Sequence, residues 1–100
     1  MRRRPGRSWY VDETYLKVQG RWRTLYRAID RDGNLIDTLL SQARDMAAAQ
    51  AFFRSAEATV GFAPDRVTTD RHGSYPRAVR STLGRKVRYR TSAYLNNRLE

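Results

Sequence analysis

Several features are missing from this chain of 100 residues, beginning with cysteine. Without cysteine the protein can form neither a disulfide scaffold nor a cysteine-based zinc site. No apolar run approaches the length of about 18 residues that crosses a membrane. The basic residues 1–7 also lack the apolar stretch of a signal peptide. These absences predict a soluble, intracellular protein of one domain that has no membrane partner.

Acidic residues are scarce as well. Ten Asp and Glu stand against twenty Lys and Arg, which leaves a formal net charge of +10 and a pI near 11.0. A charge of this size on so small a body favours a polyanionic partner, and nucleic acid is the first candidate. Hydrophobic residues still make up 40% of the chain, which argues against disorder. The composition therefore predicts a folded domain that binds nucleic acid.

The hydrophobic pattern predicts the order of the secondary-structure elements. Three early segments rich in aromatic and β-branched residues are separated by short turn signals, which is typical of an antiparallel meander. After a basic, flexible leader at residues 1–8, the predicted strands are 9–18, 21–30, 35–41, 66–69 and 86–90, and the predicted helices are 45–58, 74–83 and 94–100. The order β-β-β-α-β-α-β-α predicts an α/β fold. In it, two further strands extend the three-stranded meander, helices lie on the faces, and the last helix is truncated.

Three isolated carboxylates point to a cation site. Asp12 lies inside the most apolar strand, where a buried carboxylate is costly unless it is paired or binds a metal. Asp70 ends the fourth predicted strand, and the order β-β-β-α-β places the first and fourth strands side by side in one known architecture. Glu100 lies on the last predicted helix. Carboxylate oxygens of this kind suit a divalent cation. A purely structural alternative stays open, because Asp12 can be an edge residue, Asp70 a loop cap, and Glu100 is also the last residue.

A cationic run late in the chain also allows two interpretations. Lys86, Arg88 and Arg90 alternate with apolar residues, so they form either a solvated face or a track for phosphates. His72 could share a metal with the nearby aspartate. Because no second His or Cys completes such a site, a surface or DNA-phosphate role is favoured for His72 and the adjacent Arg71.

Two further pairs of residues are ambiguous. Asn96 and Asn97 either cap the last predicted helix or donate hydrogen bonds to a DNA backbone. Trp9 and Trp22 could stack on bases, but aromatic residues in paired strands are more often part of a core. The core interpretation is therefore favoured for both tryptophans.

Several blocks of residues occur in an order typical of one family. They are WYVDETY at 9–15, GRW at 20–22, LYRAID at 25–30, DGN at 32–34, ID at 36–37, ARD at 43–45, AAA at 47–49, FF at 52–53, TTD at 68–70, SY at 74–75 and YLNNRLE at 94–100. With these blocks the chain resembles the DDE transposases of bacterial insertion sequences, and most of all the insertion-sequence six family. The resemblance covers nearly the whole chain, residues 9–100.

The resemblance implies a ribonuclease H-like fold for residues 9–100. It also implies that Asp12, Asp70 and Glu100 form the catalytic Asp-Asp-Glu triad and hold two Mg²⁺ ions, for which Mn²⁺ can substitute. The implied reaction is Mg²⁺-dependent DNA cleavage and strand transfer during transposition of an insertion sequence. The expected partners are DNA of the transposon ends and of the target, in the bacterial cytoplasm, and a homo-oligomer is expected for the full-length protein.

Family members extend beyond this chain at both ends, with a helix-turn-helix region before it and a basic helix after the glutamate. The chain is therefore expected to be a truncated catalytic domain with little or no turnover on its own. The main alternative is a catalytically inactive DNA-binding remnant, in which the basic faces persist but the metal site is not assembled. A ribonuclease H-like nuclease unrelated to transposition is the third possibility.

Overall fold

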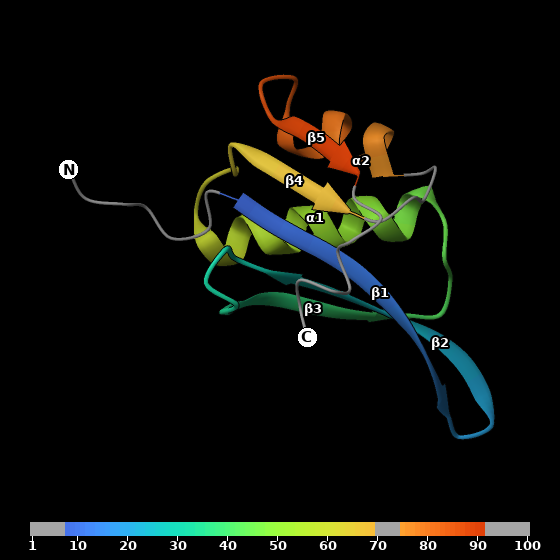
Figure 1. Ribbon diagram of the computed structural model, residues 1–100. Coiled ribbons are helices and arrows are strands. Elements are labelled where there is room, and N and C mark those ends of the chain that lie inside the picture. Colours follow the sequence, from blue (N-terminus) through green and yellow to red (C-terminus); the bar gives the residue numbers. More distant parts are fainter. Residues whose placement is uncertain (1–7, 70–74, 92–100) are drawn as a thin grey trace.

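The computed structural model describes residues 8–69 and 75–91. Its elements are β1 (Ser8–Val18), β2 (Arg21–Ile29), β3 (Leu35–Ser41), α1 (Met46–Val60), β4 (Arg66–Thr69), α2 (Tyr75–Leu83) and β5 (Arg88–Thr91) (Figure 1). Neither of the two described helices is long and apolar enough to span a membrane.

The five described strands form one mixed sheet in the order β3-β2-β1-β4-β5 (Figure 1). The meander β1-β2-β3 is antiparallel, as predicted, whereas β4 pairs with the other edge of β1 in parallel and β5 continues parallel to β4. Parallel neighbours need crossover connections, which α1 and α2 provide. The prediction that the first and fourth strands lie side by side is confirmed.

Local sequence signals set the ends of the helices. The Asp45 carboxylate caps α1 by accepting a hydrogen bond from the Ala48 amide at 2.9 Å. Gly61 ends α1 with a left-handed φ of 98°, so the helix runs two residues beyond its predicted end at residue 58. Helix α2 starts at Tyr75 and holds Pro76 in its first turn, where the missing amide hydrogen costs nothing.

Both described helices pack on the same face of the sheet, which we call the helix face. The Tyr26 ring of β2 stacks on Phe52 of α1 with 5.6 Å between centroids and meets Tyr75 of α2 edge-on at 6.4 Å. The core consists of Trp9, Val11, Tyr26, Ala28, Ala48, Ala49, Phe52, Phe53, Ala56, Val67, Tyr75, Ala78, Val79 and Leu83. Strand residues at alternate positions point the opposite way, onto what we call the open face. No described helix covers the open face (Figure 1).

Three predicted strands differ in their bounds from the observed ones, and the second of them ends at Ile29 rather than at residue 30. The first strand starts one residue earlier, at Ser8. The last strand begins at Arg88 rather than at residue 86, because its parallel pairing with β4 starts where Arg88 lies beside Arg66. Residues 85–87 form a turn instead. The leader up to residue 7 and the predicted helix at 94–100 lie outside the described residues.

Strands β1 and β2 continue beyond the rest of the sheet as a two-stranded hairpin, residues 15–23, which we call the extension (Figure 1). Strand β3 pairs with β2 only from Thr24 onward, and β4 pairs with β1 only up to Val11. Trp9 lies in the core as predicted, but the core prediction for Trp22 is wrong, since its side chain is 64% exposed. Trp22 belongs to the extension, which no other described strand or helix covers.

Candidate functional site

Asp12 lies on the open face of β1, directly opposite Arg27 of β2. The Arg27 guanidinium donates two hydrogen bonds to the carboxylate, from Nη2 to Oδ2 at 2.6 Å and from Nε to Oδ1 at 3.2 Å. The Asp12 side chain is 12% exposed and that of Arg27 is 44% exposed. The hydrogen bonds to Asp12 raise the pKa of Arg27. Asp12 is therefore a buried carboxylate with a charged partner, and that partner, Arg27, also lines an open cavity of about 340 Å³ together with Tyr10, Ile29 and the β2–β3 turn.

The pairing of β1 with β4 is the feature that bears on the predicted triad. Val11 and Thr69 occupy the last position of this parallel ladder, and Asp12 and Asp70 are the next residues of the two segments. Asp70 and Glu100 lie outside the described residues, so the triad stays a prediction. Within residues 8–69 and 75–91, no three His, Cys, Asp or Glu side chains gather as a metal site. The donor chemistry of Asp12, two carboxylate oxygens, fits a hard cation such as Mg²⁺.

Positive charge is concentrated on the open face. On the five described strands, six of the seven cationic residues share the face of Asp12, as the strand registers show. These residues are Arg21, Arg23, Arg27, Arg66, Arg88 and Arg90. The other two acidic strand residues, Glu13 and Asp37, point to the helix face, where Asp37 accepts a hydrogen bond from the Ser55 hydroxyl at 2.6 Å. The open face is thus a basic surface with a single strand carboxylate among the described residues.

The residues predicted to contact DNA are only partly described. Arg88 and Arg90 are exposed on the open face of β5, while Tyr89 between them points the other way and shares a short hydrogen bond with the Thr69 hydroxyl. Lys86 is exposed, but it lies in the turn before β5 and not on the strand. The predicted alternation therefore holds for the two arginines and not for Lys86. Arg71, His72, Asn96 and Asn97 lie outside the described residues.

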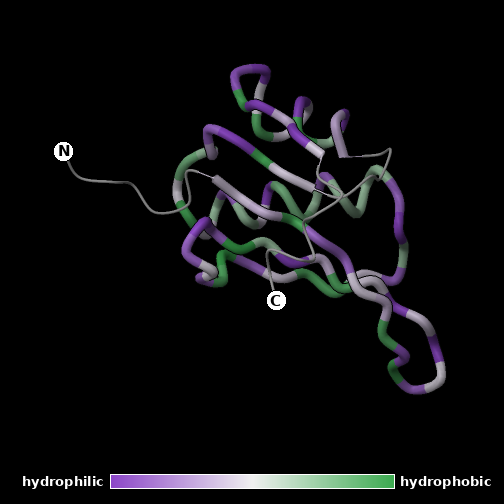
Figure 2. Tube along the Cα trace, viewed as in Figure 1, coloured by the Kyte–Doolittle hydropathy of each residue, from purple (hydrophilic) through white to green (hydrophobic). Residues whose placement is uncertain are grey.

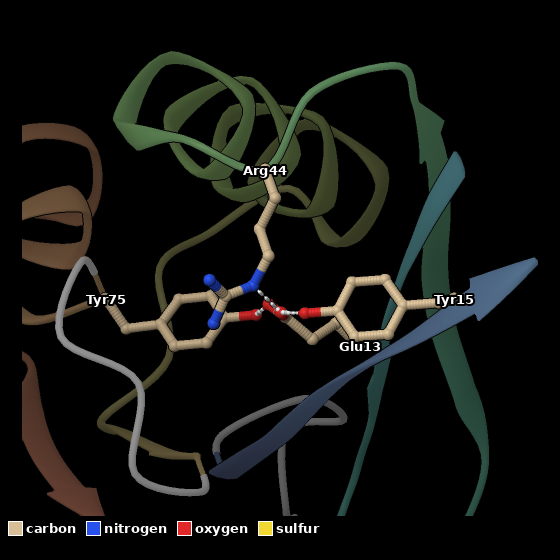
Figure 3. A network of polar contacts seen from close by, with 4 residues as sticks. All are labelled: Glu13, Tyr15, Arg44 and Tyr75. Atoms are coloured by element: carbon tan, nitrogen blue, oxygen red, sulfur yellow. Dashed lines mark hydrogen bonds and ion pairs between the residues drawn. The ribbon is translucent and has the colours of Figure 1, made fainter. Parts of the chain in front are cut away.

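Glu13 connects three elements on the helix face (Figure 3). Its side chain is 4% exposed, and its Oε2 accepts a hydrogen bond from the Tyr75 hydroxyl of α2 at 2.5 Å. Its Oε1 forms an ion pair with Arg44, just before α1, and accepts a hydrogen bond from Tyr15 at 3.2 Å. The hydrogen bond to Glu13 raises the pKa of Arg44, and desolvation followed by the Glu13 charge raises the pKa of Tyr15.

Sequence reasoning treated Glu13 only as a neighbour of Asp12 and missed its network. One signal was available, because strand alternation places Glu13 on the same face as Trp9 and Val11, the core side of β1. A carboxylate on that side needs partners to offset its burial. The identity of those partners depends on how α1 and α2 dock, which the strand pattern does not contain.

Comparison with known proteins places the chain in a family. A family model described as a DDE domain matches residues 6–100. Two Staphylococcus aureus transposases, one for the insertion sequence-like element IS431mec and one for the element IS257 in transposon Tn4003, are each 38% identical to it over 97 residues. These matches cover 93% of this chain but 43% of each transposase, so the chain spans less than half the length of these relatives.

Solved structures share the fold at low sequence identity. The HTLV-2 integrase catalytic core domain in complex with magnesium, in its dimeric form, superposes with a TM-score of 0.74 at 18% identity, over 94% of this chain and 64% of that one. A chain of the simian T-cell lymphotropic virus intasome in complex with PP2A regulatory subunit B56 gamma gives a TM-score of 0.73 at 19% identity, over 88% of this chain and 32% of that one. The predicted ribonuclease H-like fold is confirmed. Fold, family model and sequence identity agree: the chain belongs to the DDE transposases of insertion sequences, in the insertion-sequence six family.

Proposed function

We propose that this chain is a catalytic domain that cuts DNA at transposon ends and joins the ends to target DNA in a Mg²⁺-dependent reaction. The observation that carries the proposal is the position of Asp12, a buried carboxylate next to the end of the β1–β4 ladder on a face lined by arginines. Membership in the transposase family supports the same reaction. A buried carboxylate is costly even when it is paired, and carboxylate oxygens are the ligands that a hard cation such as Mg²⁺ prefers.

Asp12, Asp70 and Glu100 are the residues that would hold the metal. Two Mg²⁺ ions held there would activate an oxygen nucleophile and stabilise the leaving oxygen, and Mn²⁺ would be a substitute for them. Within the described part of the chain, Arg27 would orient the Asp12 carboxylate for this role. Two hydrogen bonds from Arg27, one to each oxygen, orient the Asp12 carboxylate and leave further lone pairs on both oxygens.

DNA is the proposed substrate of the open face. Arg88 and Arg90 on β5 and Arg66 on β4 present guanidinium groups on the side of Asp12, where they can contact phosphates. Further phosphate contacts are proposed for Lys86, Arg71, His72, Asn96 and Asn97. A homo-oligomer is proposed for the full-length protein, because the HTLV-2 integrase core, which shares the fold, is described in dimeric and trimeric forms.

Magnesium titration calorimetry on the 100-residue chain tests the metal site. The unaltered chain should take up Mg²⁺ weakly, and Asp12→Asn should lose this binding, since an amide is a far poorer ligand for a hard cation. Glu57→Gln is the matched control, because it removes one carboxylate from α1 on the helix side of the sheet. It should bind Mg²⁺ as the unaltered chain does. Equal Mg²⁺ binding by the Asp12→Asn chain would overturn the metal site and leave a DNA-binding remnant as the function.

A further inference from the structure

Apart from the hydrogen bond that Tyr15 donates to Glu13, the extension at residues 15–23 makes none of the contacts described so far that hold the fold together. It carries four large apolar side chains that are exposed: Trp22 at 64%, Tyr15 at 52%, Leu16 at 38% and Val18 at 37%. A two-stranded hairpin outside a sheet is only marginally stable in water. Figure 2 shows hydrophobic and hydrophilic residues alternating along it. A protruding, largely exposed segment of this composition is typical of a contact surface.

The two sides of the extension differ in chemistry. On the side continuous with the open face, Arg23 lies opposite Leu16 and Arg21 lies opposite Val18. On the reverse side, Lys17 lies opposite Trp22, with its Nζ 5.7 Å from the centre of the indole ring. Arg21 and Arg23 therefore continue the row that starts with Arg27 at Asp12.

The two outer arginines of this row have side chains without a partner in the described part of the molecule. Arg27 is bound to Asp12, but the side chains of Arg21 and Arg23 form no hydrogen bond or ion pair with any residue in 8–69 or 75–91. No acidic residue occurs between residues 14 and 29, whereas Lys17 adds a further positive charge. Uncompensated charge of one sign on a protruding arm favours a partner of the opposite sign.

We infer that the extension is a DNA-binding arm, whose Arg21 and Arg23 hold the phosphate backbone of the substrate on the side that leads to Asp12. The inference rests on the proposed function, and it assigns a site to residues outside the predicted DNA-binding set. Alternate residues of a strand are about 7 Å apart, so the two guanidinium groups can hold separate phosphates. The exposed Leu16 and Val18 lie beside the arginine stems and limit their freedom.

Salt-dependent DNA binding by the full 100-residue chain tests the arm. The probe is a fluorescein-labelled random-sequence duplex, titrated at salt concentrations between about 50 and 200 mM. Each phosphate contact contributes about 0.9 to the slope of log affinity against log salt, so Arg21→Gln with Arg23→Gln should reduce the slope by about 1.8. The matched control, Arg54→Gln with Arg80→Gln, removes two exposed charges from α1 and α2 on the helix side. This control should leave most of the salt slope intact. The pair Arg21→Lys with Arg23→Lys, which keeps both charges, should do the same. Circular dichroism checks that every variant is folded.

The possible outcomes distinguish a failure of the DNA-binding arm from a failure of the proposed function. Equal slopes for the extension pair and the helix pair would overturn the arm while leaving DNA binding by the open face in place. A flat salt response of the unaltered chain would instead remove the DNA-binding part of the proposed function. If the extension pair changed the sedimentation of the chain but not its salt slope, the extension would contact a second copy of the chain, which also overturns the arm.

Discussion

The two faces of the sheet differ in almost every physical property, although a single residue step along a strand separates them. The helix face holds a continuous aromatic and aliphatic core, and its carboxylate Glu13 joins β1 to α2 and to the segment before α1. Among the described strand residues, the open face holds six arginines, and its carboxylate Asp12 is bound to Arg27 on the next strand. Consecutive acidic residues of one strand thus have unrelated surroundings.

Consecutive side chains of a strand point to opposite faces of the sheet. Residues that stabilise the fold therefore alternate with residues that are available to bind a ligand. Side chains on the helix face are removed from water and contribute most of the apolar burial. Arginines on the open face repel one another and add little to folding, so their concentration there calls for an anionic partner. Substitutions on the helix face should therefore change the free energy of unfolding, whereas substitutions on the open face should change binding.

The largest expected effect follows from truncating the core. Phe52→Ala should lower the free energy of unfolding by about 3–5 kcal/mol, because the ring is fully buried and stacks on Tyr26. Urea denaturation followed by circular dichroism measures the loss. Leu40→Ala, on the open face of β3 at 49% exposure, should cost about 0.5 kcal/mol or less. Similar losses for both variants would contradict the expectation that the helix face, and not the open face, carries most of the stability.

A smaller effect is expected from Glu13. Glu13→Gln keeps the size of the side chain but removes the charge that Arg44 and Tyr75 bind, so the free energy of unfolding should fall by about 1–3 kcal/mol. Asp12→Asn is the control, because its partner Arg27 is 44% exposed and such pairs contribute about 0–1 kcal/mol. Urea denaturation of both variants measures the two losses in unfolding free energy. An equal or larger loss for Asp12→Asn would contradict the expectation that the helix face contributes more to stability than the open face.

Much of the fold could be predicted because its signals are local. Alternation defined the meander, the Asp45 cap and Gly61 defined α1, and the helical apolar stripe at Phe52 and Phe53 gave its buried side. The family resemblance supplied the topology that local patterns leave open, with the fourth strand beside the first. The start of β5 could not be located from local pattern, because it depends on where Arg88 meets Arg66 in the ladder.

The surroundings of the site were less accessible to prediction. Asp12 stood out because carboxylates are unusual inside an apolar strand, but its partner Arg27 is set by the β1–β2 register, fifteen residues away in sequence. Trp22 had the same residue type and strand pattern as Trp9. Its exposure follows from the point at which β3 stops pairing, and this end point is a property of the assembled sheet.

The smallest expected change in stability, and the sharpest test of the open face, comes from Arg27. Arg27→Gln should cost about 0–1 kcal/mol of unfolding free energy, because the Arg27 side chain is 44% exposed and water partly screens its ion pair with Asp12. Its effect on Mg²⁺ should be larger, since a positive charge bound to the Asp12 carboxylate opposes the approach of a cation. Without it, Mg²⁺ should bind about three- to tenfold more tightly in titration calorimetry. Arg23→Gln removes the same charge four residues along β2 without touching Asp12, and it should leave Mg²⁺ affinity close to that of the unaltered chain. Weaker Mg²⁺ binding by Arg27→Gln would contradict this expectation and would mean that, for metal affinity, orientation of the carboxylate by Arg27 outweighs charge repulsion.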